Sequence, residues 1–246
     1  MKSSICISIP IKSNDLREAQ ILVNKALTFN PLAIEFRFDY IKKKDYITKG
    51  YAIKLKDLLE NKCISIFTLR DKLEGGKLKI QKLERIELIK MLIQARPDFF
   101  DVELNTDLET LNNVISLSFM EKVNLIFSYH NLKETLNYET LKNIILNFEE
   151  KIIKNKLNEF DILSKSIYKL IFTAQNIEDN LVPLKLCQEF SRNKKRIISF
   201  CMDKLGIISR IMCVKLGSFL TYAALEEQTA PGQIYVKIMQ QFYELF

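Results

Sequence analysis

The chain has 246 residues, of which 48% are hydrophobic and 27% charged, a composition that excludes a disordered protein and suits one domain over 1–246. Its net charge of +7 comes largely from lysines scattered through 42–44, 54–62 and 151–156, so we expect a solvated surface that attracts anions, not a nucleic-acid partner. No apolar run approaches the roughly 18 residues that span a bilayer and no secretion signal stands at residue 1, so no membrane partner is expected.

Short runs rich in β-branched and aromatic residues recur along the chain and predict strands. In chain order these eight runs cover 5–10, 32–39, 64–70, 99–104, 123–130, 166–172, 196–202 and 216–222. The segments between them show helical periodicity, as in 83–93, where apolar residues recur every three or four positions among charged ones. Strand and helix therefore alternate along the whole chain.

Regular alternation of strand and helix is typical of parallel sheets joined by helical crossovers, and eight such units close a barrel. An open doubly wound sheet is the alternative. The first strand leads to 11–14, however, and these residues contain no glycine-rich phosphate loop. We therefore predict an α/β protein with a single-domain (β/α)8 TIM barrel, whose final helix lies in 234–246.

Polar side chains stand at or near the carboxyl ends of most of these runs, where the reacting residues of a barrel converge. They are Glu35, Arg37, Arg70, Glu103, His130, Lys169, Ser218 and Thr221. One polar strand end is usually solvated charge, whereas a series that includes the sole histidine indicates a functional site. Taken alone, His130 is better explained as a hydrogen-bonded structural residue than as a general base, so its role depends on the motifs around it.

Motifs of mixed polar residues follow one another from the second strand to the last. They are Glu35-Phe36-Arg37-Phe38-Asp39, Phe67-Thr68-Leu69-Arg70 with Glu74-Gly75-Gly76, the segment 101–104, Ser128-Tyr129-His130, the segment 198–202 with Gly206 and Ser209-Arg210, the segment 217–222, and Ala230-Pro231-Gly232-Gln233. In order and spacing this set resembles the type I 3-dehydroquinate dehydratase (3-dehydroquinase) family over nearly the whole chain.

Three positions depart from the family pattern. Asp203 replaces the usual Gly after Met202, Asn131 replaces the frequent Asp after His130, and Thr229 stands where Ser is common. Thr229 keeps the hydroxyl group. If the glycine position requires a positive φ, aspartate tolerates that backbone better than most residues do, so we expect at most a slightly altered turn.

The resemblance implies that the protein dehydrates 3-dehydroquinate to 3-dehydroshikimate through a lysine Schiff base, a step of the shikimate pathway in aromatic amino acid biosynthesis. Two lysines, Lys165 and Lys169, stand near the sixth strand. We choose Lys169 because 166–181 match more of the family pattern. Its unprotonated amine would condense with the C3 carbonyl, and burial near Arg70 and Arg210 would disfavour the ammonium form.

The acid-base and binding roles follow from the same resemblance. His130 would remove the C2 proton and return a proton to the departing C1 hydroxyl, while Glu74 would orient its imidazole ring. Arg210 would hold the substrate carboxylate with its planar guanidinium group. The other substrate-binding residues implied are Ser8, Glu35, Arg37 and Arg70 on the strands, and Thr229 and Gln233 on a loop that closes over the substrate.

No cofactor or metal is expected, because one histidine and five cysteines without a CxxC pair do not make a common zinc site, although the sequence leaves a carboxylate metal site open. The odd number of cysteines favours a reducing compartment, and we expect a cytoplasmic protein. The resemblance also suggests a homodimer. Two other interpretations stay open, namely another Schiff-base lyase or aldolase on the same barrel and, from the charge alone, a nucleic-acid-binding protein.

Overall fold

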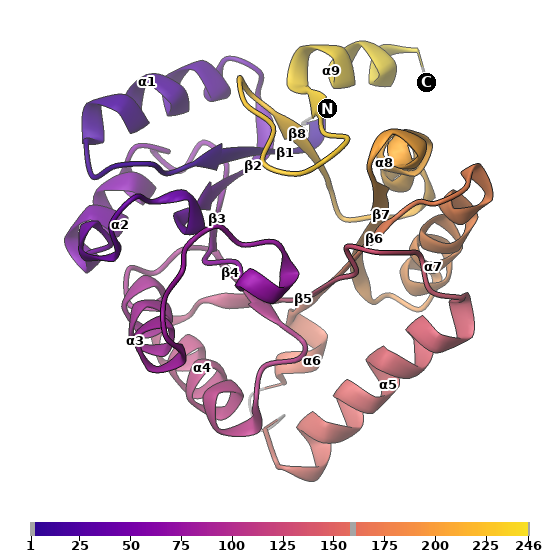
Figure 1. Ribbon diagram of the computed structural model, residues 1–246, viewed down its shortest axis with the longest axis horizontal. Coiled ribbons are helices and arrows are strands. Elements are labelled where there is room, and N and C mark those ends of the chain that lie inside the picture. Colours follow the sequence, from indigo (N-terminus) through magenta and orange to yellow (C-terminus); the bar gives the residue numbers. More distant parts are fainter. Residues whose placement is uncertain (1–2, 158–160, 246) are drawn as a thin grey trace.

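A ring of parallel strands surrounded by helices makes up the computed structural model, which describes residues 3–157 and 161–245 (Figure 1). The strands of this part of the chain are β1 (Ser3–Pro10), β2 (Pro31–Arg37), β3 (Ile64–Thr68), β4 (Phe99–Glu103), β5 (Asn124–His130), β6 (Ile167–Thr173), β7 (Arg196–Met202), β8 (Thr221–Ala224) and β9 (Ile234–Tyr235). The α-helices are α1 (Leu16–Leu27), α2 (Lys49–Asp57), α3 (Lys82–Ile93), α4 (Leu108–Glu121), α5 (Tyr138–Lys154), α6 (Ile162–Lys165), α7 (Leu181–Arg192), α8 (Ile207–Met212) and α9 (Val236–Glu244). Short 3₁₀ turns include η1 (Phe38–Tyr40), η3 (Lys72–Glu74) and η6 (Cys213–Leu216).

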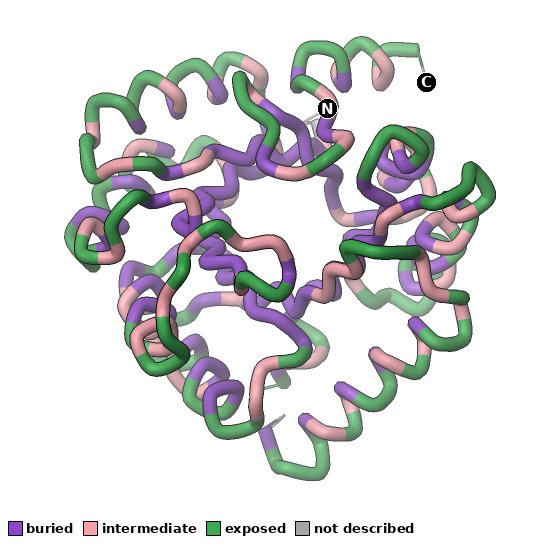
Figure 2. The backbone as a smooth tube through the Cα atoms, viewed as in Figure 1, coloured by how far each residue is buried: buried purple, intermediate pink, exposed green. Residues whose placement is uncertain are grey.

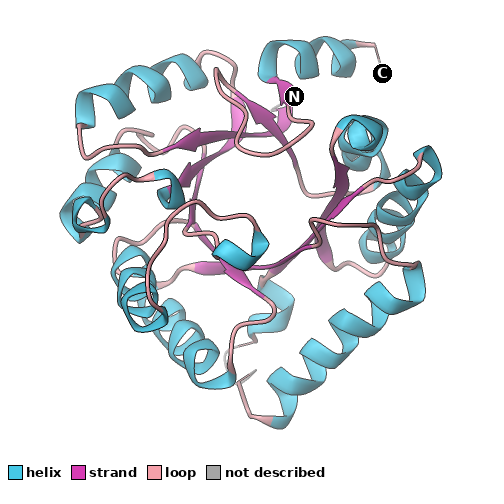
Figure 3. Ribbon diagram, in the orientation of Figure 1, coloured by secondary structure: helices cyan, strands magenta, loops and turns pink. Residues whose placement is uncertain are grey.

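Strand order explains how the sheet becomes a barrel. Neighbouring strands pair in parallel in the order β7-β6-β5-β4-β3-β2-β1-β8-β9. The segment just before β8 closes the ring, since the Phe219 backbone N–H donates to the Ile197 carbonyl of β7 over 2.7 Å. Helices cover the outside of the ring (Figure 3). The predicted (β/α)8 TIM barrel is thereby confirmed, with the two-residue β9 added beside β8.

The outer helices form where the sequence supplies caps and an apolar face. Side-chain oxygens accept hydrogen bonds from the first-turn N–H groups of four helices, and each such cap contributes about 1 kcal/mol. The capping residues are Asp15 for α1, Thr48 for α2, Asp107 for α4 and Asn137 for α5. Buried and exposed positions alternate along these helices, with the buried ones toward the strands (Figure 2). Within the described residues, no helix has both the length and the apolar character that a membrane crossing needs.

The predicted eighth strand was misplaced. Residues 216–222 were expected to be extended, but 213–216 form the turn η6, and Gly217 follows with a φ of 103°. A Cβ at Gly217 would lie 2.4 Å from the Ser191 side chain, so this tight bend requires glycine. The strand therefore begins only at Thr221, after the bend has returned the chain to the sheet.

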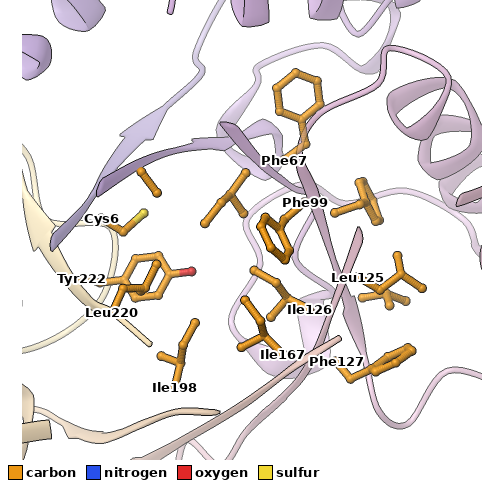
Figure 4. Packing of buried hydrophobic residues seen from close by; sticks show 14 of the residues in the cluster. Cys6, Phe67, Phe99, Leu125, Ile126, Phe127, Ile167, Ile198, Leu220 and Tyr222 are labelled. Carbon is orange, nitrogen blue, oxygen red and sulfur yellow. The ribbon is translucent and has the colours of Figure 1, made fainter. Parts of the chain in front are cut away.

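The barrel interior is built in layers. Figure 4 shows side chains of one apolar layer, among them Cys6, Phe99, Ile126, Ile167, Ile198 and Leu220, pointing into the ring. Because side chains alternate along a strand, residues two positions further on face the interior as well. On four of these strands they are the polar residues Ser8, Asp101, Ser128 and Lys169. An apolar floor thus supports a charged layer toward the carboxyl ends of the strands.

Candidate active site

A cavity of about 310 Å³ lies over the charged layer and is lined mainly by side chains from the carboxyl ends of the strands. Nine of the ten predicted site residues line it, namely Glu35, Arg37, Arg70, Glu74, His130, Lys169, Arg210, Thr229 and Gln233. The tenth, Ser8, does not line this cavity. Its hydroxyl donates to Glu35 over 2.6 Å and accepts from Thr229 over 3.0 Å, so it supports two residues that do.

The Lys169 amine is buried and held by two carboxylates. Its Nζ donates to Asp101 Oδ2 over 2.9 Å and lies 3.5 Å from Glu35 Oε1. The Tyr222 ring covers another side, with its centroid 4.3 Å from Nζ. The nearest charged groups are therefore carboxylates, where the sequence had suggested arginines.

Lys165, the other candidate, lies in a different place. Lys165 belongs to the short helix α6, which precedes β6, and it is exposed. Its backbone carbonyl accepts a hydrogen bond from Arg196. Of the two lysines, only Lys169 lines the cavity.

Arg70 organises the charged layer by binding several oxygens at once. Its Nη2 lies 2.7 Å from Asp101 Oδ2, and its Nη1 donates to Glu103 over 2.9 Å and to Ser128 over 2.7 Å. Asp101 is fully buried, yet Arg70 and Lys169 outweigh this burial and hold its pKa well below the usual range. Asp101 is therefore an anion that fixes the position of the Lys169 nitrogen and not a proton acceptor.

The fourth-strand motif includes Asp101, to which the sequence assigns no role. A usable signal was present, because Asp101 and Glu103 alternate along β4 and must face the same side of a strand otherwise built from Phe99, Phe100 and Val102. Two carboxylates on one buried face require cationic partners. The sequence of β4 does not identify these cations, since one of them, Lys169, lies on β6, two strands away.

His130 and Glu74 form a hydrogen-bonded pair at the edge of the cavity. Glu74 Oε2 lies 2.9 Å from His130 Nδ1 and accepts the backbone N–H of the same residue over 3.0 Å. Burial, with the charges of Arg70 and Lys169, lowers the pKa of His130 well below its usual value. Burial likewise raises the pKa of Glu74 to about 8, although Arg70 opposes the rise.

The ionisation of Glu74 decides which ring nitrogen of His130 can act as a base. An ionised Glu74 accepts Nδ1–H and leaves Nε2 as a free acceptor. A protonated Glu74 donates to Nδ1, so the ring proton moves to Nε2. The pair is therefore ready for base catalysis only when Glu74 is ionised.

Among the residues that the structure describes, Arg210 is a buried cation without a carboxylate partner. It is 1% exposed, and its guanidinium donates only to backbone carbonyls, those of Pro231 at 3.2 Å and Tyr222 at 3.5 Å. Its Nε has no hydrogen-bond partner within 3–157 and 161–245, and the group lies over the Phe200 ring, 4.4 Å from the centroid. Burial lowers its pKa to about 10. Because this cation lines the cavity, the site suits an anionic ligand.

Arg37, the third guanidinium of the site, is already paired. Its Nε and Nη2 donate to the two oxygens of Asp39 over 2.8 and 2.9 Å. This bidentate ion pair joins the end of β2 to the turn η1. Asp39 thereby neutralises Arg37, which leaves Arg210 as the guanidinium available to an anion.

The loop after β8 supplies the last side chains of the cavity. The Thr229 N–H donates to Gln233 Oε1 over 2.7 Å, and the Tyr40 hydroxyl donates to the Thr229 carbonyl over 3.0 Å. Gly232 packs so closely that a Cβ there would lie 2.4 Å from the Asp203 carbonyl oxygen. Asp203 itself has a φ of 67°, as expected for a residue in a glycine position.

Metal-ligating residues do not gather within 3–157 and 161–245, where no group of three or more His, Cys, Asp or Glu could hold an ion. A buried amine, a neutral imidazole and an unpaired guanidinium converge on one cavity at the carboxyl ends of the strands. Such an arrangement defines an enzyme of the (β/α)8 barrel class.

Comparison with known proteins gives the particular family. The model of the type I 3-dehydroquinase family matches residues 5–246. A 3-dehydroquinate dehydratase of Streptococcus thermophilus is 31% identical over 244 residues, 97% of each chain, and one of Methanococcus maripaludis is 29% identical over 245 residues. The type I enzyme of Clostridium difficile, solved with covalently modified comenic acid, superposes with a TM-score of 0.81 at 25% identity, covering 99% of this chain and 92% of its own. The chain belongs to the type I 3-dehydroquinase family.

Proposed function

We propose that this protein dehydrates 3-dehydroquinate to 3-dehydroshikimate through a Schiff base on Lys169, as a step of the shikimate pathway toward aromatic amino acids. The observation that carries the proposal is the meeting of Lys169, the His130–Glu74 pair and the unpaired Arg210 in one cavity. Arg210 lacks an anion, and 3-dehydroquinate carries one carboxylate. The names of the relatives support the same substrate.

The first stage is condensation of the Lys169 amine with the C3 ketone. The nitrogen adds to C3, the carbonyl oxygen leaves as water, and the product is an iminium ion. Its positive charge lies where Asp101 and Glu35 now hold the ammonium nitrogen. A site that already stabilises a cation at this position needs no rearrangement when the iminium forms.

The second stage is elimination. The iminium withdraws electrons from C2, so its proton can be taken by Nε2 of His130 while Glu74 holds Nδ1–H. The electron pair expels the C1 hydroxyl, which receives a proton from the imidazolium and leaves as water. Hydrolysis of the product iminium then restores the Lys169 amine.

Binding of the substrate would use the cations and hydrogen-bonding groups around the cavity. Arg210 would bind the carboxylate, and Thr229 and Gln233 would close over it from their loop. The remaining side chains assigned to substrate binding are Glu35, Arg37 and Arg70 at the cavity wall, with Ser8 behind Glu35. A homodimer and a cytoplasmic location stay predictions from the sequence.

Ultraviolet absorbance tests the proposal, because the product has a conjugated double bond that the substrate lacks. Purified protein mixed with 3-dehydroquinate should generate this absorbance. Lys169→Ala should abolish it, whereas Lys165→Ala, a matched control outside the cavity, should leave it unchanged. His130→Ala should slow turnover by about 10²–10⁴. A wild-type protein that generates no conjugated product would refute the proposed activity.

A further inference from the structure

The His130–Glu74 pair borders a second cavity, larger than the one that holds Lys169. This cavity has a volume of about 540 Å³ and lies among the β3–α3 segment, the start of α3, the β4–α4 segment and the end of β5. Arg70, Glu74 and His130 line both cavities. The β3–α3 segment passes in front of β4 and β5 in Figure 1. The acid-base pair thus stands in a wall between two spaces.

The second cavity is unsuited to the reacting substrate but suited to water. Neither Lys169 nor Arg210 lines it, so a ketone there could reach neither the amine nor the free guanidinium. Hydrogen-bonding side chains line much of its wall, including Asn105, Thr106, Asp107 and Thr110. Its volume has room for on the order of ten water molecules with such partners.

The rim of the second cavity shows that it opens to solvent. Leu73 is 89% exposed, and the Lys82 side chain is 70% exposed. Both lie in or after the β3–α3 segment. Solvent can therefore approach His130 through a cavity that Lys169 does not line.

We propose that the second cavity is a water route, through which the His130–Glu74 pair exchanges protons and water with solvent while substrate fills the catalytic cavity. This inference rests on the proposed function for its purpose. In that reaction His130 protonates the departing hydroxyl, so the eliminated water forms beside His130. When substrate and the 229–233 loop fill the catalytic cavity, the second cavity gives this water a way out to solvent.

The same route serves hydrolysis of the product iminium. One water adds its oxygen to C3, the C3–N bond breaks, and a C=O bond forms. Both protons of that water end on the nitrogen, so the iminium becomes the Lys169 ammonium and the charge is conserved. Each catalytic cycle therefore consumes one water after releasing two, all within reach of His130.

Hydrogen exchange at the imidazole C2–H tests the route directly, because His130 is the only histidine in the chain. The experiment uses the unliganded protein and four variants built from one type of substitution. Thr106→Phe obstructs the second cavity and Thr173→Phe the catalytic cavity, since each threonine lines only one of them. The double variant obstructs both, and Thr140→Phe, at an exposed position of α5, is the control.

If the second cavity is a water route, the His130 C2–H still exchanges with deuterium in the single variant Thr173→Phe. In the double variant this exchange is lost on the same time scale. Thr140→Phe behaves like the wild type. Exchange lost fully in Thr173→Phe alone would overturn the proposal, because solvent would then reach His130 only past Lys169. Rates are compared over a pH series so that a changed imidazole pKa is separated from changed access. If Thr106→Phe does not fold, Asn105→Phe obstructs the same cavity from its exposed rim.

A second arm uses protein whose Lys169 carries a borohydride-reduced substrate adduct. Exchange at His130 should continue in the wild-type adduct and stop in the Thr106→Phe adduct. Failure to form any adduct would count against the proposed chemistry alone, since the comparison of the four variants needs no substrate. Equal exchange in the two adducts would overturn the water route and leave the proposed chemistry intact.

Discussion

Arg210 offers a prediction in which stability and activity change in opposite directions. The cation is fully buried with no carboxylate partner among the described residues, and burial lowers its pKa from 12.5 to about 10. A pKa lowered this far corresponds to about 3 kcal/mol by which the folded protein disfavours the charged form. Arginine is charged at neutral pH in the folded and the unfolded chain alike. The unliganded protein therefore bears this cost at pH 7.

Arg210→Met should remove the cost while filling similar space. We expect the unliganded variant to be more stable by up to about 3 kcal/mol, or about 6–12 °C in melting temperature for a chain of this size. Its kcat/KM should fall at least about 100-fold, because the charged hydrogen bonds to the substrate carboxylate are lost. Arg192→Met, at an exposed position in the last turn of α7, is the control and should stay within about 0.5 kcal/mol of the wild type.

Thermal denaturation with and without 3-dehydroshikimate measures the change in stability and the loss of product binding, and a steady-state assay measures kcat/KM. At a product concentration of about 100 times Kd, the wild type should gain about 2.7 kcal/mol. Arg210→Met should gain much less at the same concentration. A variant that is less stable than the wild type without ligand would refute the reasoning, since Arg210 would then contribute to the unliganded fold.

Three further substitutions test other parts of the site. Glu74→Gln should remove the fall of kcat/KM below about pH 8, because an amide oxygen accepts His130 Nδ1–H without ionising. An unchanged pH profile would contradict this coupling between Glu74 and His130. Asp203→Gly should stabilise the protein by about 1 kcal/mol in urea denaturation, since a φ of 67° with a ψ of 179° is a glycine conformation, and a loss of stability would show that no strain is stored there. Tyr222→Phe should be neutral or stabilising by about 1–3 kcal/mol on thermal denaturation, because the buried hydroxyl has no partner in the described part of the chain, and clear destabilisation would reveal one.

Much of the barrel could be predicted because its strands are buried on both faces and are therefore apolar runs. The predicted 196–202 coincides with β7, and most other runs differ from their strands by only one or two residues at either end. The eighth run failed because Leu216, Phe219 and Leu220 make it equally apolar, while its path is set by Gly217. A left-handed bend at one glycine leaves no periodic signal in its neighbours.

The sequence predicted which residues form the site but not all of the contacts between them. Parallel strands bring their carboxyl ends together, so Arg37, Glu103 and His130 at those ends were expected to converge. The ion pair of Lys169 with Asp101 spans β6 and β4, which are not neighbours. Such a contact depends on the curvature of the closed barrel, which no single strand encodes.

The central claim is that Lys169 is the nucleophile, and the most direct measurement locates a trapped adduct. Protein incubated with 3-dehydroquinate and borohydride, then digested and analysed by mass spectrometry, should carry the reduced substrate on the peptide containing Lys169. Protein without substrate should carry none. An adduct on Lys165, or full turnover with no trapped adduct, would contradict the account.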